Sequence, residues 1–243
     1  MRQRNKLQGV SRTHHGPVDM MRNTGAPVTR MAANENQEPS LSEKISLALK
    51  ADYAPGDPDD LPPCPSGVSA FPKPMQAAVC GGVFLGIGAG TIAVLSGLAA
   101  LPTGWNAGLE FSSPLSLGVI FMAAGISHFT LHEDFCRIYP GKGAWGFWYL
   151  PGSASFHVNW TGVAELLGGL GLALGGLGLG PQGLMPAAAL SLFALVIAVT
   201  PANVYMFTHG AQLPAGLEVP VLGHAIRGAF QCLLLGVLWS LAS

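Results

Sequence analysis

Five long apolar stretches lie between residues 76 and 243, and every basic residue of the chain falls on one side of the membrane that they would cross. Each stretch is close to the roughly 20 residues that an α-helix needs to span the hydrocarbon core of a bilayer. The predicted spans are about Ala77–Leu101, Phe111–His132, Val158–Leu179, Ala187–Phe207 and Leu222–Leu241. The sequence therefore predicts an all-α integral membrane protein.

Charged residues are scarce and unevenly placed. They make up 10% of the 243 residues, whereas soluble domains carry about a quarter. Nine of the 12 Lys and Arg residues precede residue 76, and with five spans Arg137, Lys142 and Arg227 fall on the same side. We call this side, which holds the N-terminus, the cis side, and a positive-inside bias of this kind sets the orientation of membrane proteins. Five buried helices of a soluble protein are the alternative, disfavoured because the loops carry so few charges.

Residues 1–75 divide into two parts of opposite charge. Residues 1–30 hold six basic residues against one acid and have no apolar core, which is typical of an organelle transit peptide; an ordinary basic tail is the alternative. Residues 31–75 form an acidic, Pro-rich tail with seven acids. There, Ser40 and Glu43 fit a capping box before an apolar repeat of four residues. We expect a short amphipathic helix, lying on the membrane or docked on the bundle.

Each of the four later spans contains a strongly polar residue. The four are His128, Glu165, Asn203 and Arg227. At 1.5 Å per residue, all of them lie within roughly 5–10 Å of the cis boundary, so we predict one polar cluster, with Glu165 and Arg227 as its ion pair. Ionisable groups inside a membrane are costly and are often functional. A purely structural cluster, with Arg227 reaching the surface, is the alternative.

Aromatic residues gather in the long cis loop and at its edges. Trp145, Trp148, Tyr149 and Trp160 are the candidates for contacting a cofactor, as a lid over the cluster or a docking face for a pigment. A belt of aromatic residues at the membrane interface is the alternative explanation. His128, His132 and Glu133 follow one another at helical spacing, but no second ligand pair repeats the pattern, so no metal site is predicted.

Four motifs in the later spans resemble those of a known family. They are Gly125-Ile-Ser-His128-Phe, Gly162-Val-Ala-Glu165-Leu-Leu-Gly-Gly169, Thr200-Pro-Ala-Asn203-Val-Tyr-Met206, and Arg227 in the last span. Over about residues 115–241 these motifs look like the successive helices of the DoxX-like family of small multi-pass membrane proteins. The resemblance implies a four-helix transmembrane bundle, here with one extra N-terminal transmembrane helix. It also implies a link to membrane oxidoreductase assemblies, including a thiosulfate:quinone oxidoreductase. The loop 141–160 resembles that of plastid members from algae.

Two functions follow as expectations. The first is an accessory or assembly subunit of a plastid membrane redox complex, in contact with membrane lipid and other membrane-protein subunits. The alternative is a small quinone-linked membrane oxidoreductase, in which Arg227 holds a quinone oxygen and Glu165 or His128 carries a proton. Quinone or pigment is the expected cofactor class. The five-span domain of residues 76–243 is expected in a chloroplast membrane, the thylakoid rather than the envelope, with its N-terminus in the stroma. No basic face indicates nucleic-acid binding.

Overall fold

A computed structural model describes residues 38–58, 61, 64–211 and 219–243. The transit peptide predicted over residues 1–30 lies outside these residues. All helices belong to one compact unit, residues 39–243. Over the described residues the fold is all-α, as predicted, and contains no strand. Its helices are α1 (Leu41–Lys50), α2 (Lys73–Ala99), α3 (Thr103–Thr130), α4 (His132–Arg137), α5 (Ala154–Gly176), α6 (Leu184–His209) and α7 (Val221–Ala242), with short 3₁₀ turns η1 (Val68–Ala70) and η2 (Ala144–Gly146).

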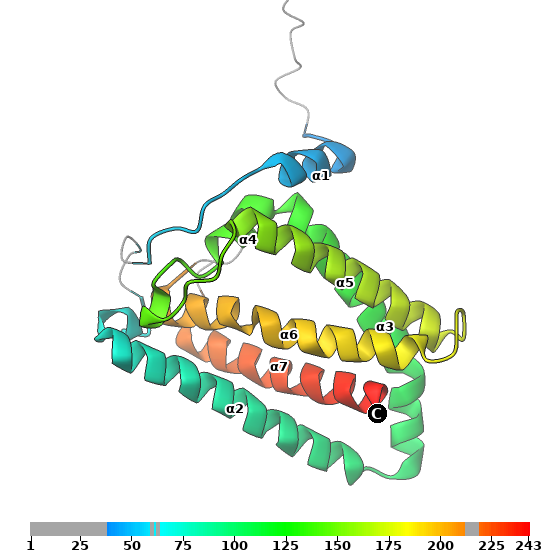
Figure 1. The fold of residues 1–243 in the computed structure, drawn as a ribbon. Coiled ribbons are helices and arrows are strands. Elements are labelled where there is room, and N and C mark those ends of the chain that lie inside the picture. The colour runs from blue at the N-terminus through cyan, green and yellow to red at the C-terminus, as the bar shows by residue number, and fades with distance from the viewer. Residues whose placement is uncertain (1–37, 59–60, 62–63, 212–218) are drawn as a thin grey trace, which may run out of the picture. The chain divides into compact units, whose positions relative to one another are not determined.

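The five long helices alternate in direction (Figure 1). α5 packs extensively on α3 and on α6, and α7 packs on α6 and on α2. By contrast, α3 barely touches α7, so α3, α5, α6 and α7 do not form a closed ring. The end of the unit that carries α4 and η2 corresponds to the predicted cis side, and we call it the cis end.

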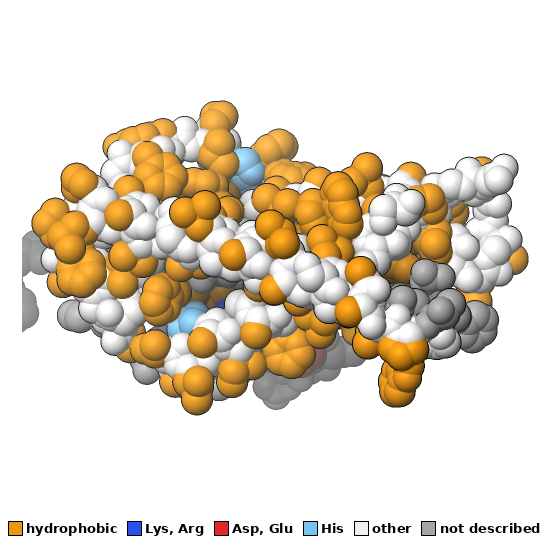
Figure 2. Space-filling model, turned by 90° about the horizontal axis from the view of Figure 1, so that it is seen from below, with side chains coloured by type: hydrophobic (Ala, Val, Ile, Leu, Met, Phe, Trp, Pro, Cys, Tyr) orange, Lys and Arg blue, Asp and Glu red, His pale blue; other side chains and the backbone are white. Residues whose placement is uncertain are grey.

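Four of the described helices are long and apolar enough to cross a membrane. They are α2, α3 from Ser112 onward, α6 and α7. α5 is 23 residues long but is not among these four helices, and its first half contains His157, Asn159 and Glu165, so a fifth span is not confirmed. Figure 2 shows one face of the molecule covered mainly by hydrophobic side chains. The chain is therefore a helical membrane protein.

Capping residues explain where several helices begin. In α1 both halves of the predicted capping box form: the Glu43 amide donates to Ser40 Oγ over 3.3 Å, and the Ser40 amide donates to Glu43 Oε2 over 2.8 Å. These bonds satisfy amides that a helix start leaves free, and they lower the pKa of the Glu43 carboxyl. α5 begins at Ala154, earlier than predicted, because Ser153 caps it by accepting from the Phe156 amide.

α3 is longer than the predicted span Phe111–His132, although its part that is apolar enough to cross a membrane begins at Ser112, close to the prediction. α3 begins at Thr103 and runs through Pro114 without interruption of the helix. The prediction started the span at the uncharged run after Glu110, but a helix can extend beyond the apolar run that it contains. The loop between α2 and α3 is consequently short.

α1 is docked on the bundle, which decides between the two placements expected for the amphipathic helix. Ala48 is buried, and its carbonyl accepts from the Asn159 side chain of α5 over 3.3 Å. Farther along, the Tyr53 amide donates to Ser155 Oγ over 2.7 Å, and the Tyr53 carbonyl accepts from the Ala154 amide. These bonds fasten the segment after α1 to the start of α5.

α3 and α5 approach each other most closely at four glycines. A Cβ atom on Gly169 would lie 2.7 Å from the Gly118 carbonyl oxygen, and one on Gly125 would lie 2.7 Å from the Gly162 carbonyl oxygen. No side chain fits at such distances, so glycine is required for this helix contact. The contact fixes α3 against α5, and with it the side chains that both helices direct toward the cis end.

Candidate functional site

A cavity of about 690 Å³ lies between α3, α5, α6 and α7 at the cis end. Its size falls in the range of about 300–1,000 Å³ that is usual for small-molecule sites. The structure brings all four polar residues predicted from the sequence onto its wall, namely His128, Glu165, Asn203 and Arg227. Because α3 and α7 diverge, the cavity has α3 residues on one side and α7 residues on the other. We call it the polar cavity.

Glu165 is buried beside His128. Its Oε2 atom lies 3.2 Å from His128 Nδ1, but the same Nδ1 is 3.0 Å from the Ala124 carbonyl oxygen. A carbonyl only accepts, so Nδ1 carries the hydrogen and directs it to Ala124. Stacking on Phe135, with ring centroids 4.1 Å apart, holds the imidazole in this position. Glu165 Oε2 is left without a hydrogen bond although Glu165 is 8% exposed.

Arg227 belongs to a chain of hydrogen bonds between α6 and α7. Arg227 Nη2 donates to Asn203 Oδ1 over 2.6 Å, and Asn203 Nδ2 donates to Gln231 Oε1 over 3.2 Å. Gln231 Nε2 then donates to Thr200 Oγ1 over 2.6 Å, and that hydroxyl donates to the Val196 carbonyl. We call Arg227, Asn203, Gln231 and Thr200 the polar seam. Every bond runs in one donor-to-acceptor direction and ends on the backbone.

The predicted ion pair between Glu165 and Arg227 does not form. Glu165 is next to His128, and Arg227 donates to Asn203 Oδ1 and, over 3.4 Å, to Met206 Sδ. No carboxylate among the described residues accepts from Arg227. Because both residues lie at the same depth in the membrane, the sequence correctly predicted that they share one site. Depth does not determine which side chains contact each other, so the predicted pairing was wrong.

Two of the four candidate aromatic residues line the polar cavity. Trp148 and Trp160 contribute to its wall near Tyr139 and His157, whose rings stack with centroids 4.8 Å apart. Tyr149 is outside the cavity lining and largely exposed. The loop therefore covers the cis side of the polar cavity with part of the predicted aromatic set.

Trp145 has a structural position instead. It is 1% exposed, and its Nε1 donates to Thr208 Oγ1 over 2.9 Å. Its φ of 54° lies in the left-handed region, which is uncommon for a bulky residue and costs of order 1–3 kcal/mol. Packing of its ring against Tyr205 and Trp148 offsets this strain. Trp145 thus anchors the loop to α6.

Three buried polar atoms on the wall of the polar cavity make no hydrogen bond. They are Glu165 Oε2, the Tyr139 hydroxyl and Trp148 Nε1. Burial raises the pKa of the Tyr139 hydroxyl, and the neighbouring Trp148 indole offsets part of that rise without reaching good hydrogen-bonding geometry. An unsatisfied buried polar group costs about 1–3 kcal/mol. The residues that line the cavity therefore include one buried acceptor and two buried potential donors whose hydrogen-bonding capacity is unused.

His157 is a residue of this site that the sequence did not point to, and Thr200 was named only as the first residue of a motif, without a role in the polar cluster. Thr200 looks like an ordinary threonine in an apolar helix, and its signal was its position three residues before Asn203. His157 sits in the first turn of α5, where a polar residue at a helix start is common. Among the described residues, no group of three or more His, Cys, Asp or Glu side chains could hold a metal ion.

Cys136 lies just outside this site, and its thiol is expected to react slowly. It is buried 3.6 Å from His132 Nε2, and burial raises its pKa to about 11 from 9.0. Only the thiolate is nucleophilic. A variant that retains Cys136 alone should react with iodoacetamide at pH 7 about 100-fold more slowly than an ordinary cysteine, and its rate should rise about tenfold per pH unit up to about pH 11. Mass spectrometry of the time course measures this; a rate that levels off near pH 9 would contradict it.

Comparison with known protein families gives one match. Residues 117–242, which contain the whole polar seam and both sides of the polar cavity, match the family described as a domain of unknown function (DUF8561). The chain belongs to this family. The matched region is just over half of the chain and covers the second half of α3 together with α4 to α7, whereas α1 and α2 precede it. No curated protein and no solved structure matches the sequence.

Proposed function

We propose that this member of the DUF8561 family binds a quinone-class molecule in the polar cavity, as a subunit of a membrane redox complex. One observation carries the proposal: a single cavity wall holds a cation with no carboxylate partner among the described residues, Arg227, and a buried acid without a hydrogen bond, Glu165. Such a wall favours a ligand that supplies both an acceptor and a donor.

A quinone has this dual character. The carbonyl oxygens of the oxidised form accept hydrogen bonds, which Arg227 can donate, and the hydroxyls of the reduced form donate, which Glu165 can accept. Trp148 and Trp160 offer aromatic faces to its ring. Phe121 of α3 and Phe230 of α7 line the cavity where these helices diverge, giving an apolar tail a route toward the bilayer.

Reduction of a quinone to a quinol takes up two electrons and two protons. Glu165 and His128 are the side chains placed to pass protons to a bound head group. We assign the electron donor to a partner subunit, which is why the proposal places the chain in a complex. Binding of the quinone is the part of this function that the described residues support directly.

Replacing Glu165 by glutamine tests the proposal. The variant loses the charged acceptor, so its affinity for the reduced form should fall about tenfold, because a hydrogen bond to a charged group contributes about 1.5–3 kcal/mol. Affinity for the oxidised form should change by less than about twofold, since an amide can also donate to a carbonyl. Titration of both redox forms of a short-chain quinone analogue measures the two affinities. Equal effects on both forms, or no effect on either, would contradict the role of Glu165. Ser116→Ala is the control, because Ser116 bonds only within α3.

An accessory subunit that holds no quinone is the second candidate, favoured by the surface of α2. This helix is the least covered of the four apolar helices, and Cβ atoms on Gly82 and Gly86 would meet nothing within 4 Å. Gly90, four residues after Gly86, packs inside the chain instead, against Cys232. Purification in mild detergent followed by mass spectrometry separates the candidates: a stoichiometric protein partner without quinone supports the second, and a protein that runs alone removes the subunit role.

The finer assignments are also proposals. A five-span topology with the N-terminus in the stroma is supported by the alternating direction of α5 (Figure 1). Labelling of a cysteine placed in residues 177–183 from the side that holds the N-terminus would contradict it.

The DoxX-like relationship and the chloroplast membrane rest on sequence motifs and on residues 1–30. Failure of the labelled chain to enter isolated chloroplasts would exclude that location.

A further inference from the structure

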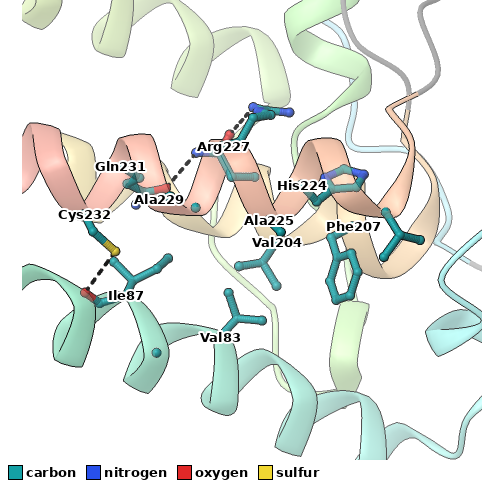
Figure 3. A pocket seen from close by; sticks show the side chains of 14 residues that line it. Val83, Ile87, Val204, Phe207, His224, Ala225, Arg227, Ala229, Gln231 and Cys232 are labelled. Atoms are coloured by element: carbon teal, nitrogen blue, oxygen red, sulfur yellow. Dashed lines mark hydrogen bonds between the residues drawn. The ribbon is translucent and has the colours of Figure 1, made fainter.

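A second cavity, of about 420 Å³, lies between α2, α6 and α7 (Figure 3). It is separated from the polar cavity by part of the polar seam, because Arg227, Asn203 and Gln231 line both. We call it the α2–α7 cavity. Nothing in the quinone proposal uses it.

The walls of the α2–α7 cavity are largely apolar. Val83 and Ile87 of α2 face Val204 and Phe207 of α6 across it (Figure 3). Gly86 of α2 lines the same space, and a Cβ atom there would meet nothing within 4 Å. Because α2 and α7 are both helices able to cross a membrane, the surrounding medium is lipid hydrocarbon, and the cavity suits an alkyl chain rather than water.

The polar groups of the α2–α7 cavity lie toward the cis end. His224 stands in the first turn of α7, where the helix N-terminus adds positive potential, and its ring contacts Phe207 with centroids 5.5 Å apart. Arg227 follows one turn later. None of the 14 lining residues is acidic. Figure 2 shows a hollow on one face in which a histidine and a basic side chain are visible among hydrophobic ones.

We propose that the α2–α7 cavity binds one acyl chain of an anionic membrane lipid, with the lipid phosphate near His224 and Arg227. The apolar wall selects the chain, and the positive charge of Arg227, with His224 beside the same space and no acidic residue in the lining, selects the head group. A lipid in this position would bridge α2, which precedes the family-matched region, to α6 and α7. It would also contact the polar seam from the side opposite to the polar cavity.

Native mass spectrometry of the full chain in mild detergent tests the site, with phosphatidylglycerol and phosphatidylcholine of identical acyl chains as probes. Phosphatidylglycerol should bind at least about tenfold more tightly than phosphatidylcholine. Gly86→Phe, which fills the cavity, should weaken phosphatidylglycerol binding about tenfold or more. Gly82→Phe is the matched control, because Gly82 lies on the same helix in open space and does not line the cavity.

Four results would overturn the proposal. Retention of phosphatidylglycerol by Gly86→Phe, or equal losses in Gly86→Phe and Gly82→Phe, would remove the cavity as the chain site. Equal binding of both lipids, or an unchanged preference in His224→Ala, would remove the head-group assignment. Gly86 does not line the polar cavity, so quinone titration of the same variants shows whether a failure concerns the lipid site or the quinone proposal.

Discussion

Replacing Arg227 by alanine is expected to weaken binding of an oxidised quinone analogue by between about 10- and 150-fold. The guanidinium is the one charged donor on the described wall of the polar cavity, and a hydrogen bond from a charged group contributes about 1.5–3 kcal/mol. Each 1.4 kcal/mol corresponds to about tenfold in Kd. Reduced quinol should be affected less, because its hydroxyls donate to Glu165. Titration calorimetry on both redox forms measures the difference.

Arg227→Lys separates charge from geometry. Lysine keeps the positive charge but lacks the planar fork that lets Arg227 donate to Asn203 and Met206 at once. We expect an affinity between those of the wild-type protein and Arg227→Ala. A lysine variant as weak as the alanine variant would show that the polar seam, rather than the charge, supports the ligand.

Arg137→Ala is the matched control for this prediction. Arg137 is also an arginine near the cis end, but it pairs with Glu133 and Asp134 on the exposed face of α4. Exposed ion pairs contribute about 0–1 kcal/mol, so quinone affinity and thermal stability should both stay close to wild type. Unchanged binding in Arg227→Ala, or an equal loss in Arg137→Ala, would remove Arg227 from the site.

The membrane helices and the depth of the polar residues could be predicted from the sequence for simple physical reasons. A bilayer fixes the length of an apolar run, and a constant rise of 1.5 Å per residue converts position in a run into depth. The depth of each polar residue was calculated from the cis end of its own helix, and the calculated depths agreed. This is why the sequence could predict a shared site for His128, Glu165, Asn203 and Arg227. The capping box of α1 was predictable because it depends on residues three positions apart.

The rotation of each helix about its axis could not be predicted in the same way. Depth does not determine which way a side chain points, so Glu165 was paired with Arg227 although it lies beside His128. Glycine spacing likewise did not predict where helices meet. Cβ atoms on Gly82 and Gly86, four residues apart on α2, would meet nothing within 4 Å, whereas the close contact of α3 with α5 uses pairs seven residues apart, such as Gly118 and Gly125.

Replacing Gly169 by leucine is expected to lower the melting temperature by roughly 6–12 °C. The new Cβ atom would lie 2.7 Å from the Gly118 carbonyl oxygen and 2.9 Å from the Met122 amide nitrogen. Both are backbone atoms of α3, so no rotamer change relieves the clash and the helices must separate. Overpacking costs about 1–3 kcal/mol, and this site belongs at the upper end; 1 kcal/mol shifts the midpoint by about 2–4 °C in a chain of this size.

Separation of α3 from α5 should also disturb the polar cavity, because His128 and Glu165 come from these two helices. A Cβ atom on Gly162 would lie 2.7 Å from His128 Cβ, so the glycine contact extends to the site itself. Gly169→Leu should therefore weaken quinone binding as well as stability, although Gly169 does not line the polar cavity. Gly82→Leu, in open space on α2, should change neither quantity. Thermal unfolding in detergent and quinone titration of both variants measure the two effects. A Gly169→Leu variant as stable as Gly82→Leu would mean that α3 and α5 are not held together by this contact, and the arrangement of His128 beside Glu165 would then need another cause.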